Sequence, residues 1–411
     1  MAQIKYSANL AAADFTFSFS YKGPSVMIAA GDQNYFQATA DWAGQTPQRG
    51  INIPQVMYCE NTVPTAEGYR SVAYKWFVEP ALPLTQRFIK YFSIFEGTGA
   101  SALLGITADK KIYVLSAATS GEWTLVTWND TEFGPIQGTW DAGAQITWTT
   151  ADIFSLIHIA GYGTFAFNYL ANSLVYVPLT GLDDTKLNGI CASSGYLVAW
   201  DDATIYWSST EHILDFVPSL ITGAGSAKVA GLKGNIKLCK EIGGGFIIYS
   251  DVTVLSAQYS SNSAIPFIFD VLAGGAGIRH ADHVTADINT QVHFVWSTSG
   301  LLGVELHQVK TMFPQLTDFI ASGISDSSTT DGYPTVNWLD DYKEVRLAIM
   351  SGRYLCVSFG VENTALPGEY ATHDLSQSML YDMQLRRWGK LNIDHVQIFE
   401  APFVAQQQVF F

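Results

Sequence analysis

The chain is short of basic residues and of cysteine, and each shortage argues against a class of protein. Its 411 residues hold 22 Lys and Arg against 37 Asp and Glu, a net charge of −15. A protein that grips nucleic-acid phosphates needs the opposite sign, whereas an acidic surface favours solubility and lets DNA slide past without holding it. The cysteines form no C-x-x-C pair, so neither a disulfide framework nor a zinc site is expected. We predict reduced thiols, mostly in the core, at Cys59, Cys191, Cys239 and Cys356.

Long hydrophobic runs and enzyme signatures are missing too. No apolar run approaches the length of a membrane span, so no membrane insertion is expected. Near the start of the chain, Asp14 and Thr16 stand where an export signal would need apolar residues. Gly243 to Gly245 is followed by a strand pattern without Lys-Ser/Thr, unlike a phosphate loop. The chain has neither the G-x-S-x-G motif of serine hydrolases nor the Asp box of sialidases, so we predict no catalysis and no cofactor.

Aromatic residues (13%) and 35 glycines are plentiful, as expected of many short strands linked by tight turns. The stretch from Lys228 to Ile278 shows the pattern best. Phe246 to Tyr249 is an apolar run that ends at a Ser-Asp turn, and Val252 to Gln258 then alternates. A further strand is predicted at Phe267 to Leu272. One such small sheet cannot bury its apolar face alone, so more sheets of the same kind are expected.

Six hairpins of this kind recur along the chain, at intervals of roughly 30 to 60 residues, which is the scale of propeller blades. We therefore predict an all-β, β-propeller-like fold of about six irregular blades, with one or few short helices. The first strands of these hairpins carry, in order, Leu104, Ala166, Leu197, Ile247, Phe294 and Leu355.

Three regions are predicted. Residues 1–50 form an N-terminal extension, in which Phe15 to Phe19 is a strand with a hairpin partner at Val26 to Ala30. Residues 51–400 form the propeller-like domain, including a short helix at Pro314 to Ala321. Residues 401–411 form a C-terminal tail that docks through its two final phenylalanines, if it docks at all.

Three groups of residues invite a chemical interpretation. The doublets Asp183-Asp184, Asp201-Asp202 and Asp340-Asp341 fall at predicted turns, where Asp caps its own backbone, so turn chemistry is favoured over a glycosidase pair. His280-Ala-Asp-His283, with Asp287 and His293 nearby, offers too few ligands at sensible spacing, so we predict no metal site. Four tryptophans are favoured as blade packing over stacking on sugars or bases, namely Trp123, Trp128, Trp140 and Trp148.

The order of several short motifs resembles the packaged-DNA stabilisation proteins, the tail nozzle or hub proteins of short-tailed bacteriophages. The strongest likeness is the strand, turn and strand from Phe246 to Ser256, followed by Pro266-Phe-Ile-Phe269 and by Gly274 to Gly277. The resemblance spans about 57 to 390, and the first 45 residues have no counterpart. The family-like positions are Tyr69, Arg70, Trp207, Phe216, Phe246, Tyr249, Pro266, Phe267, Phe269, Gly277, Trp296, Tyr381, Asp382 and Trp388.

The resemblance implies a virion structural protein of the phage tail, assembled in the host bacterial cytoplasm. Its subunits would form a homo-oligomeric ring, expected to be a hexamer, that forms the DNA exit channel and retains packaged DNA. Its partners would be portal or adaptor proteins, tail fibres or spikes, and double-stranded DNA in transient non-specific contact. Two alternatives stay open: a carbohydrate-binding or glycan-degrading propeller for host recognition, and another connector or fibre-attachment component.

Overall fold

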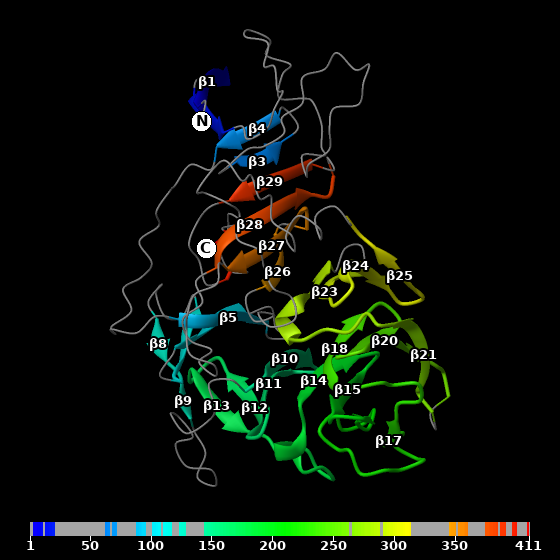
Figure 1. Ribbon diagram of the computed structural model, residues 1–411. Helices are drawn as coiled ribbons and strands as arrows, with labels where there is room; N and C mark the ends of the chain where they lie inside the picture. Colours follow the sequence, from blue (N-terminus) through cyan, green and yellow to red (C-terminus); the bar gives the residue numbers. More distant parts are fainter. Residues whose placement is uncertain are drawn as a thin grey trace.

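The protein is an all-β propeller of six blades arranged in a ring (Figure 1). The computed structural model describes residues 3–10, 13–20, 62–65, 68–71, 88–95, 101–107, 110–116, 123–128, 144–262, 265–287, 291–313, 345–350, 352–360, 375–384, 387–391, 397–400 and 409–410. Within these ranges there is no α-helix, and the only helical turns are two 3-10 segments, η3 (Asp184–Lys186) and η4 (Ala281–His283). The helix predicted at 314–321 lies outside the described residues. No helix in the described ranges is long and apolar enough to cross a membrane.

Each blade is a sheet of four antiparallel strands that follow one another in the chain, and blade 2 has one additional strand at its edge that pairs in parallel. Blade 1 contains β5 (Phe88–Phe95), β6 (Ser101–Thr107), β7 (Ile112–Ser116) and β8 (Thr124–Leu125). Blade 2 contains β10 (Ile146–Ala151), β11 (Phe154–Ile159), β12 (Gly163–Asn168), β13 (Ser173–Tyr176) and also β9 (Thr127–Trp128). Blade 3 contains β14 (Gly189–Ser193), β15 (Tyr196–Trp200), β16 (Thr204–Trp207) and β17 (Gly225–Lys228).

The second half of the ring repeats the pattern. Blade 4 contains β18 (Ile236–Ile242), β19 (Gly245–Ser250), β20 (Thr253–Tyr259) and β21 (Phe267–Gly274). Blade 5 contains β22 (Val284–Asp287), β23 (Val292–Ser297), β24 (Gly300–Glu305) and β25 (Gln308–Thr311). Blade 6 contains β26 (Val345–Met350), β27 (Tyr354–Gly360), β28 (Leu375–Asp382) and β29 (Arg387–Leu391).

All six predicted hairpins are confirmed, one in each blade. Five of the six residues used to mark the predicted hairpins lie on the second strand of a blade, but Ala166 lies on the third strand, β12. The intervals between the predicted hairpins therefore look less regular than the intervals between the blades. The segment from Trp123 to Trp128 carries two short strands that belong to different blades. Its first half, β8, completes blade 1, whereas β9 pairs in parallel with β13 of blade 2.

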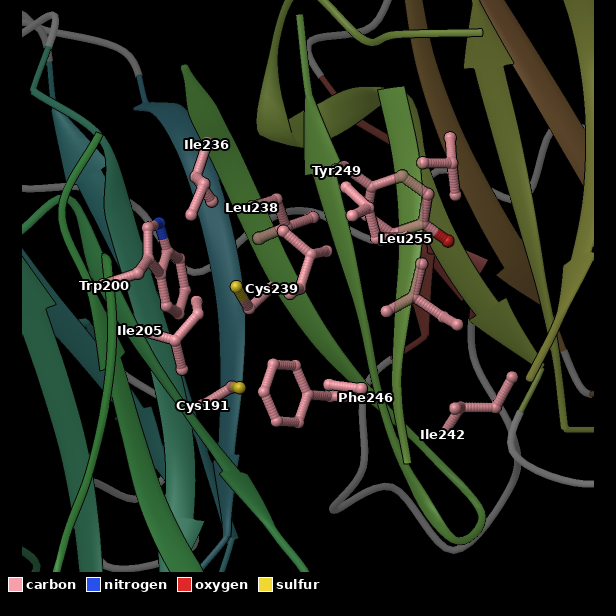
Figure 2. Packing of buried hydrophobic residues seen from close by; sticks show 14 of the residues in the cluster. Cys191, Trp200, Ile205, Ile236, Leu238, Cys239, Ile242, Phe246, Tyr249 and Leu255 are labelled. Atoms are coloured by element: carbon pink, nitrogen blue, oxygen red, sulfur yellow. The ribbon is translucent and has the colours of Figure 1, made fainter. Parts of the chain in front are cut away.

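Neighbouring blades are held together by apolar side chains from their facing sheets. Figure 2 shows this between blades 3 and 4, where Cys191, Trp200 and Ile205 lie opposite Cys239 and Phe246. Cys356 is buried in blade 6, so three of the four cysteines occupy core positions, as predicted. Cys59 lies outside the described residues.

Polar side chains add specific links where the first strands of the blades approach one another. Thr147 and Thr149 of β10 use their hydroxyl oxygens to accept hydrogen bonds from the backbone N–H groups of Ile190 and Ala192 in β14, both at 2.9 Å. Thr147 and Thr149 are two positions apart, so both hydroxyl groups lie on the same face of β10. There they accept hydrogen bonds from N–H groups of β14 that point away from its strand partner.

Segments from both ends of the chain pack around blade 6. The hairpin of β3 (Thr62–Thr65) and β4 (Gly68–Ser71) continues that blade outward beyond β29 (Figure 1). Phe15 to Phe19 is confirmed as a strand, β2 (Ala13–Ser20), and its partner is β1 (Gln3–Leu10). The partner predicted at 26–30 lies outside the described residues.

The ring closes between blades 6 and 1 through a segment near the C-terminus. The Gln397 side chain accepts a hydrogen bond of 3.0 Å from the backbone N–H of Tyr91 in β5. Ile398 is buried against Met350 and Leu380 of blade 6. Beyond it, β30 (Phe399–Glu400) pairs with β31 (Val409–Phe410). The predicted tail therefore contributes a strand to this closure.

Candidate functional site

A cavity of about 480 Å³ lies at the centre of the ring, among the first strands of the blades. Its walls come mainly from β10, β14, β18 and β22, with Lys90 of β5 at one side and η4 at another. Much of the lining is apolar, including Ile146, Ile190 and Leu238. A volume of this size fits a small molecule rather than a macromolecule.

A charged cluster occupies the η4 side of this cavity. Lys90 Nζ lies 3.1 Å from Asp282 Oδ1, so an ion pair links blade 1 to the start of blade 5 across the ring. His280 Nδ1 lies 3.4 Å from the other carboxylate oxygen. Burial raises the pKa of Asp282, but the charges of Lys90, His280 and Arg346 outweigh that effect and hold the pKa well below its usual value. Asp282 is therefore a fixed anion with its partners already in place.

The residues considered as metal ligands are used for packing and pairing instead. His283 is buried, and Asp287 lies in β22. His293 accepts a hydrogen bond from the Tyr249 hydroxyl and donates one to the Glu241 carbonyl, both at 2.8 Å. Burial lowers the pKa of His293 to about 3, so the ring is neutral. Among the described residues, no three His, Cys, Asp or Glu side chains form a group that could hold a metal ion.

Of the two acidic doublets that the structure describes, Asp201 caps its own turn as predicted, whereas Asp184 accepts its hydrogen bonds from strands of the preceding blade. Asp201 accepts hydrogen bonds from the N–H groups of Ala203 and Thr204 and from the Tyr206 hydroxyl. Asp184 is buried and accepts from the Thr164 N–H and from a tyrosine hydroxyl. Residues 340–341 lie outside the described ranges.

Of the clustered tryptophans, two are packing residues and one faces the cavity. Trp123 and Trp128 pack in blades 1 and 2. Trp148 lines the cavity with 38% of its surface exposed, beside Phe92 (ring centroids 4.9 Å apart) and with Lys90 Nζ 5.9 Å from its ring centroid. Trp140 lies outside the described residues.

The family-like positions of blades 3 to 5 gather in the core. The Phe267 ring packs edge-on against Trp207 and Phe246, and Tyr249 is fully buried in the same cluster. Phe216 fills the space between blades 2 and 3. Pro266 and Trp296 are also buried, whereas Phe269 is half-buried at the edge of the cluster.

Gly277 marks a close approach of two backbones. A Cβ atom built there would lie 2.1 Å from the carbonyl carbon and oxygen of Asp251, so only glycine fits. We expect Gly277→Ala to lower the free energy of unfolding by about 2 kcal/mol through overpacking. Chemical denaturation measures this loss, and Gly274→Ala is the matched control because a Cβ at that position meets nothing within 4 Å. Equal losses in the two variants would contradict the interpretation.

The remaining family-like positions lie at blade 6. Tyr69 and Arg70 are in β4, and Trp388 pairs in register with Tyr381. Asp382 is fully buried, and its carboxylate accepts hydrogen bonds from the Arg353 guanidinium in the β26–β27 turn. This ion pair fixes the turn against the end of β28.

We expect Arg353→Met to lower the free energy of unfolding by about 2 kcal/mol, because it leaves the buried Asp382 carboxylate without its cation. The double variant with Asp382→Asn should recover part of the loss, which urea denaturation would detect. Lys186→Met is the control: the Lys186–Asp183 pair is exposed, so its removal should leave the stability unchanged. If the double variant loses as much free energy of unfolding as the two single variants added together, the two side chains are not coupled.

The sequence did not single out Lys90 or Lys240, which line the cavity from β5 and β18. The signal for Lys240 was a charged pair, Lys240-Glu241, inside the apolar segment from Ile236 to Ile242. A charge in a strand that is otherwise buried indicates a polar cavity or channel beside it.

No family model matches the chain, and no curated protein matches it. Among solved structures, AztD from Citrobacter koseri is 12% identical over 74% of this chain and 74% of that chain, with a TM-score of 0.39. BamB from Moraxella catarrhalis is 12% identical over 71% and 70%, with a TM-score of 0.35. YCF48 bound to D1 peptide is 10% identical over 75% and 82%, with a TM-score of 0.42. These are likenesses of fold, and they assign no activity to this chain.

Proposed function

We propose that this protein is a virion structural protein, one subunit of the oligomeric nozzle or hub ring at the tail of a short-tailed bacteriophage. The ring would form the DNA exit channel, retain the packaged genome and anchor tail fibres or spikes. The observation that carries the proposal is the ordered set of family-like positions. Four of them lie in one core across blades 3 and 4, so the likeness follows the packing of the fold there: Trp207, Phe246, Tyr249 and Phe267.

The surface supports assembly into a larger particle. Turns that join first to second or third to fourth strands lie at the same end of the propeller, because strands alternate in direction within each blade. These turns carry exposed aliphatic side chains in three blades, and such side chains gathered at one end favour contact with another protein. The side chains are those of Ile153, Leu170, Leu220, Ile221 and Ile265.

The net charge of −15 supports a conduit for DNA. An acidic ring repels phosphates and so gives DNA a passage to which it does not adhere. No catalysis and no cofactor are part of the proposal.

Native mass spectrometry and negative-stain imaging of the purified protein test it. Six copies of the 45.0 kDa chain would give about 270 kDa and closed rings, with a central hole of roughly 20 Å or more, wide enough for duplex DNA. Because such rings can depend on their connector, the measurement is repeated with the cognate portal and adaptor proteins. A chain that stays monomeric in both conditions overturns the proposal.

A carbohydrate-binding or glycan-degrading propeller is the second candidate. The observation in its favour is that Trp148, Asp282 and Glu241 line the same cavity, since sugar sites combine aromatic and acidic side chains. Against a hydrolytic pair, Asp282 is held by Lys90. A glycan array and an assay for reducing-end release test this candidate: binding that Trp148→Ala abolishes would support it, and a blank array would exclude it.

A further inference from the structure

The cavity at the centre of the propeller contains a cation without a partner. Lys240, on β18, is half-buried and lines the cavity. Within the part of the chain that the structure describes, no hydrogen bond or ion pair reaches its ammonium group, whereas Lys90 across the cavity is paired with Asp282. A half-buried ammonium without an acceptor is costly, and a bound anion would remove that cost.

The balance of charge around the cavity favours an acidic ligand of low charge. The charged side chains of the lining are the ammonium groups of Lys90 and Lys240 and the carboxylates of Asp282 and Glu241. Lys90 is already paired with Asp282, so Lys240 is the ammonium group that a ligand would meet. A dianion such as phosphate would meet one unpaired ammonium and two carboxylates, so a monoanion is the better match.

The rest of the lining indicates what the anion is attached to. Ile146, Ile190, Leu238 and Val284 offer apolar walls, and the exposed part of the Trp148 indole offers an aromatic surface. Apolar walls with a few placed polar groups are typical of small-molecule sites, and about 480 Å³ lies within the range of such sites.

We propose that the central cavity binds a small organic acid, with its carboxylate on the Lys240 ammonium and its flat apolar body against Trp148. This site is independent of the assembly proposed above, because it lies within one propeller. Burial lowers the pKa of free Lys240, and a bound carboxylate would raise it again, so affinity falls as the pH rises through that pKa.

The experiment compares small aromatic carboxylates, beginning with benzoate and naphthoate, with their neutral amides on the full chain. Ligand-observed NMR detects binding and calorimetry gives the dissociation constant. The carboxylates are expected to bind at least tenfold more tightly than the amides, and Lys240→Met should remove that difference. Lys237→Met is the matched control, because Lys237 lies on the same strand and does not line the cavity.

Each result decides the proposal. Equal binding of carboxylates and amides, no binding of either, or full binding to the folded Lys240→Met variant overturns it. Inorganic phosphate that binds as tightly as the carboxylates also overturns it, since the site would then recognise charge alone. If Lys240→Met does not fold, the comparison of acid with amide on the wild-type chain and the pH dependence of that difference still decide.

Discussion

Replacing Phe267 with alanine is expected to lower the free energy of unfolding by about 4 kcal/mol. Phe267 is 1% exposed and packs edge-on against Tyr196, Trp207 and Phe246, so its ring joins β21 to the inner strands of blade 4 and to blade 3. Its removal leaves a cavity that rigid strands on all sides cannot close, and the lost transfer energy adds to the cost of that cavity.

Urea denaturation of the purified variant measures this loss. Ile268→Thr is the matched control: Ile268 is the next residue on the same strand, is 54% exposed, and should cost much less. A loss below about 1 kcal/mol for Phe267→Ala would mean that the core of blades 3 and 4 collapses around the gap, and the assignment of Phe267 as a central packing residue would be wrong.

Acid is expected to destabilise the protein by about 6 kcal/mol between pH 7 and pH 5, a third from each of three buried histidines. Burial lowers the pKa of His158 and of His280 to about 4 and that of His293 to about 3, from the usual 6.5. Below pH 6.5 the unfolded chain binds protons at these rings and the folded chain does not. Stability is therefore complete above pH 6.5 and is lost as the pH falls toward the folded pKa values.

Burial keeps the His158 ring neutral, and two hydrogen bonds fix its tautomer. Its Nε2–H donates to the Leu187 carbonyl at 3.1 Å, and its Nδ1 accepts from the Thr164 hydroxyl at 3.0 Å. Urea denaturation at pH 7, 6 and 5 gives the pH dependence, and His158→Gln should remove about a third of it. The same pH dependence in the variant and the wild-type chain would show that other groups cause the acid sensitivity.

The blades could be predicted from the sequence because their second and third strands are buried on both faces. Such strands read as apolar runs, for example Phe246 to Tyr249 and Tyr196 to Trp200, each closed by a Ser or Asp turn. A hairpin is a local feature, so strand pattern and turn residues suffice to find it. The turn at Asp201 shows why the Asp201-Asp202 doublet could be interpreted correctly: the Asp201 carboxylate caps two N–H groups within three residues.

The first strands of the blades, and with them the cavity, could not be predicted in this way. β10 reads Ile-Thr-Trp-Thr-Thr-Ala, because its side chains face the central cavity and the next blade rather than one apolar core. The pairing of Lys90 with Asp282 joins residues 192 positions apart, which no local pattern encodes. The division of 123–128 between two blades depends on β13, which lies further along the chain.

The closure of the ring by Gln397 and Ile398 sets the order in which the protein can be completed during synthesis. Blade 1 leaves the ribosome early, but Tyr91 in its first strand waits for a partner 306 residues later. Until that partner arrives, the open edges of blades 1 and 6 are exposed to other nascent chains, and long-range pairing of this kind is slow. A ribosome that has made blades 1 to 5 therefore carries an open arc rather than a closed ring.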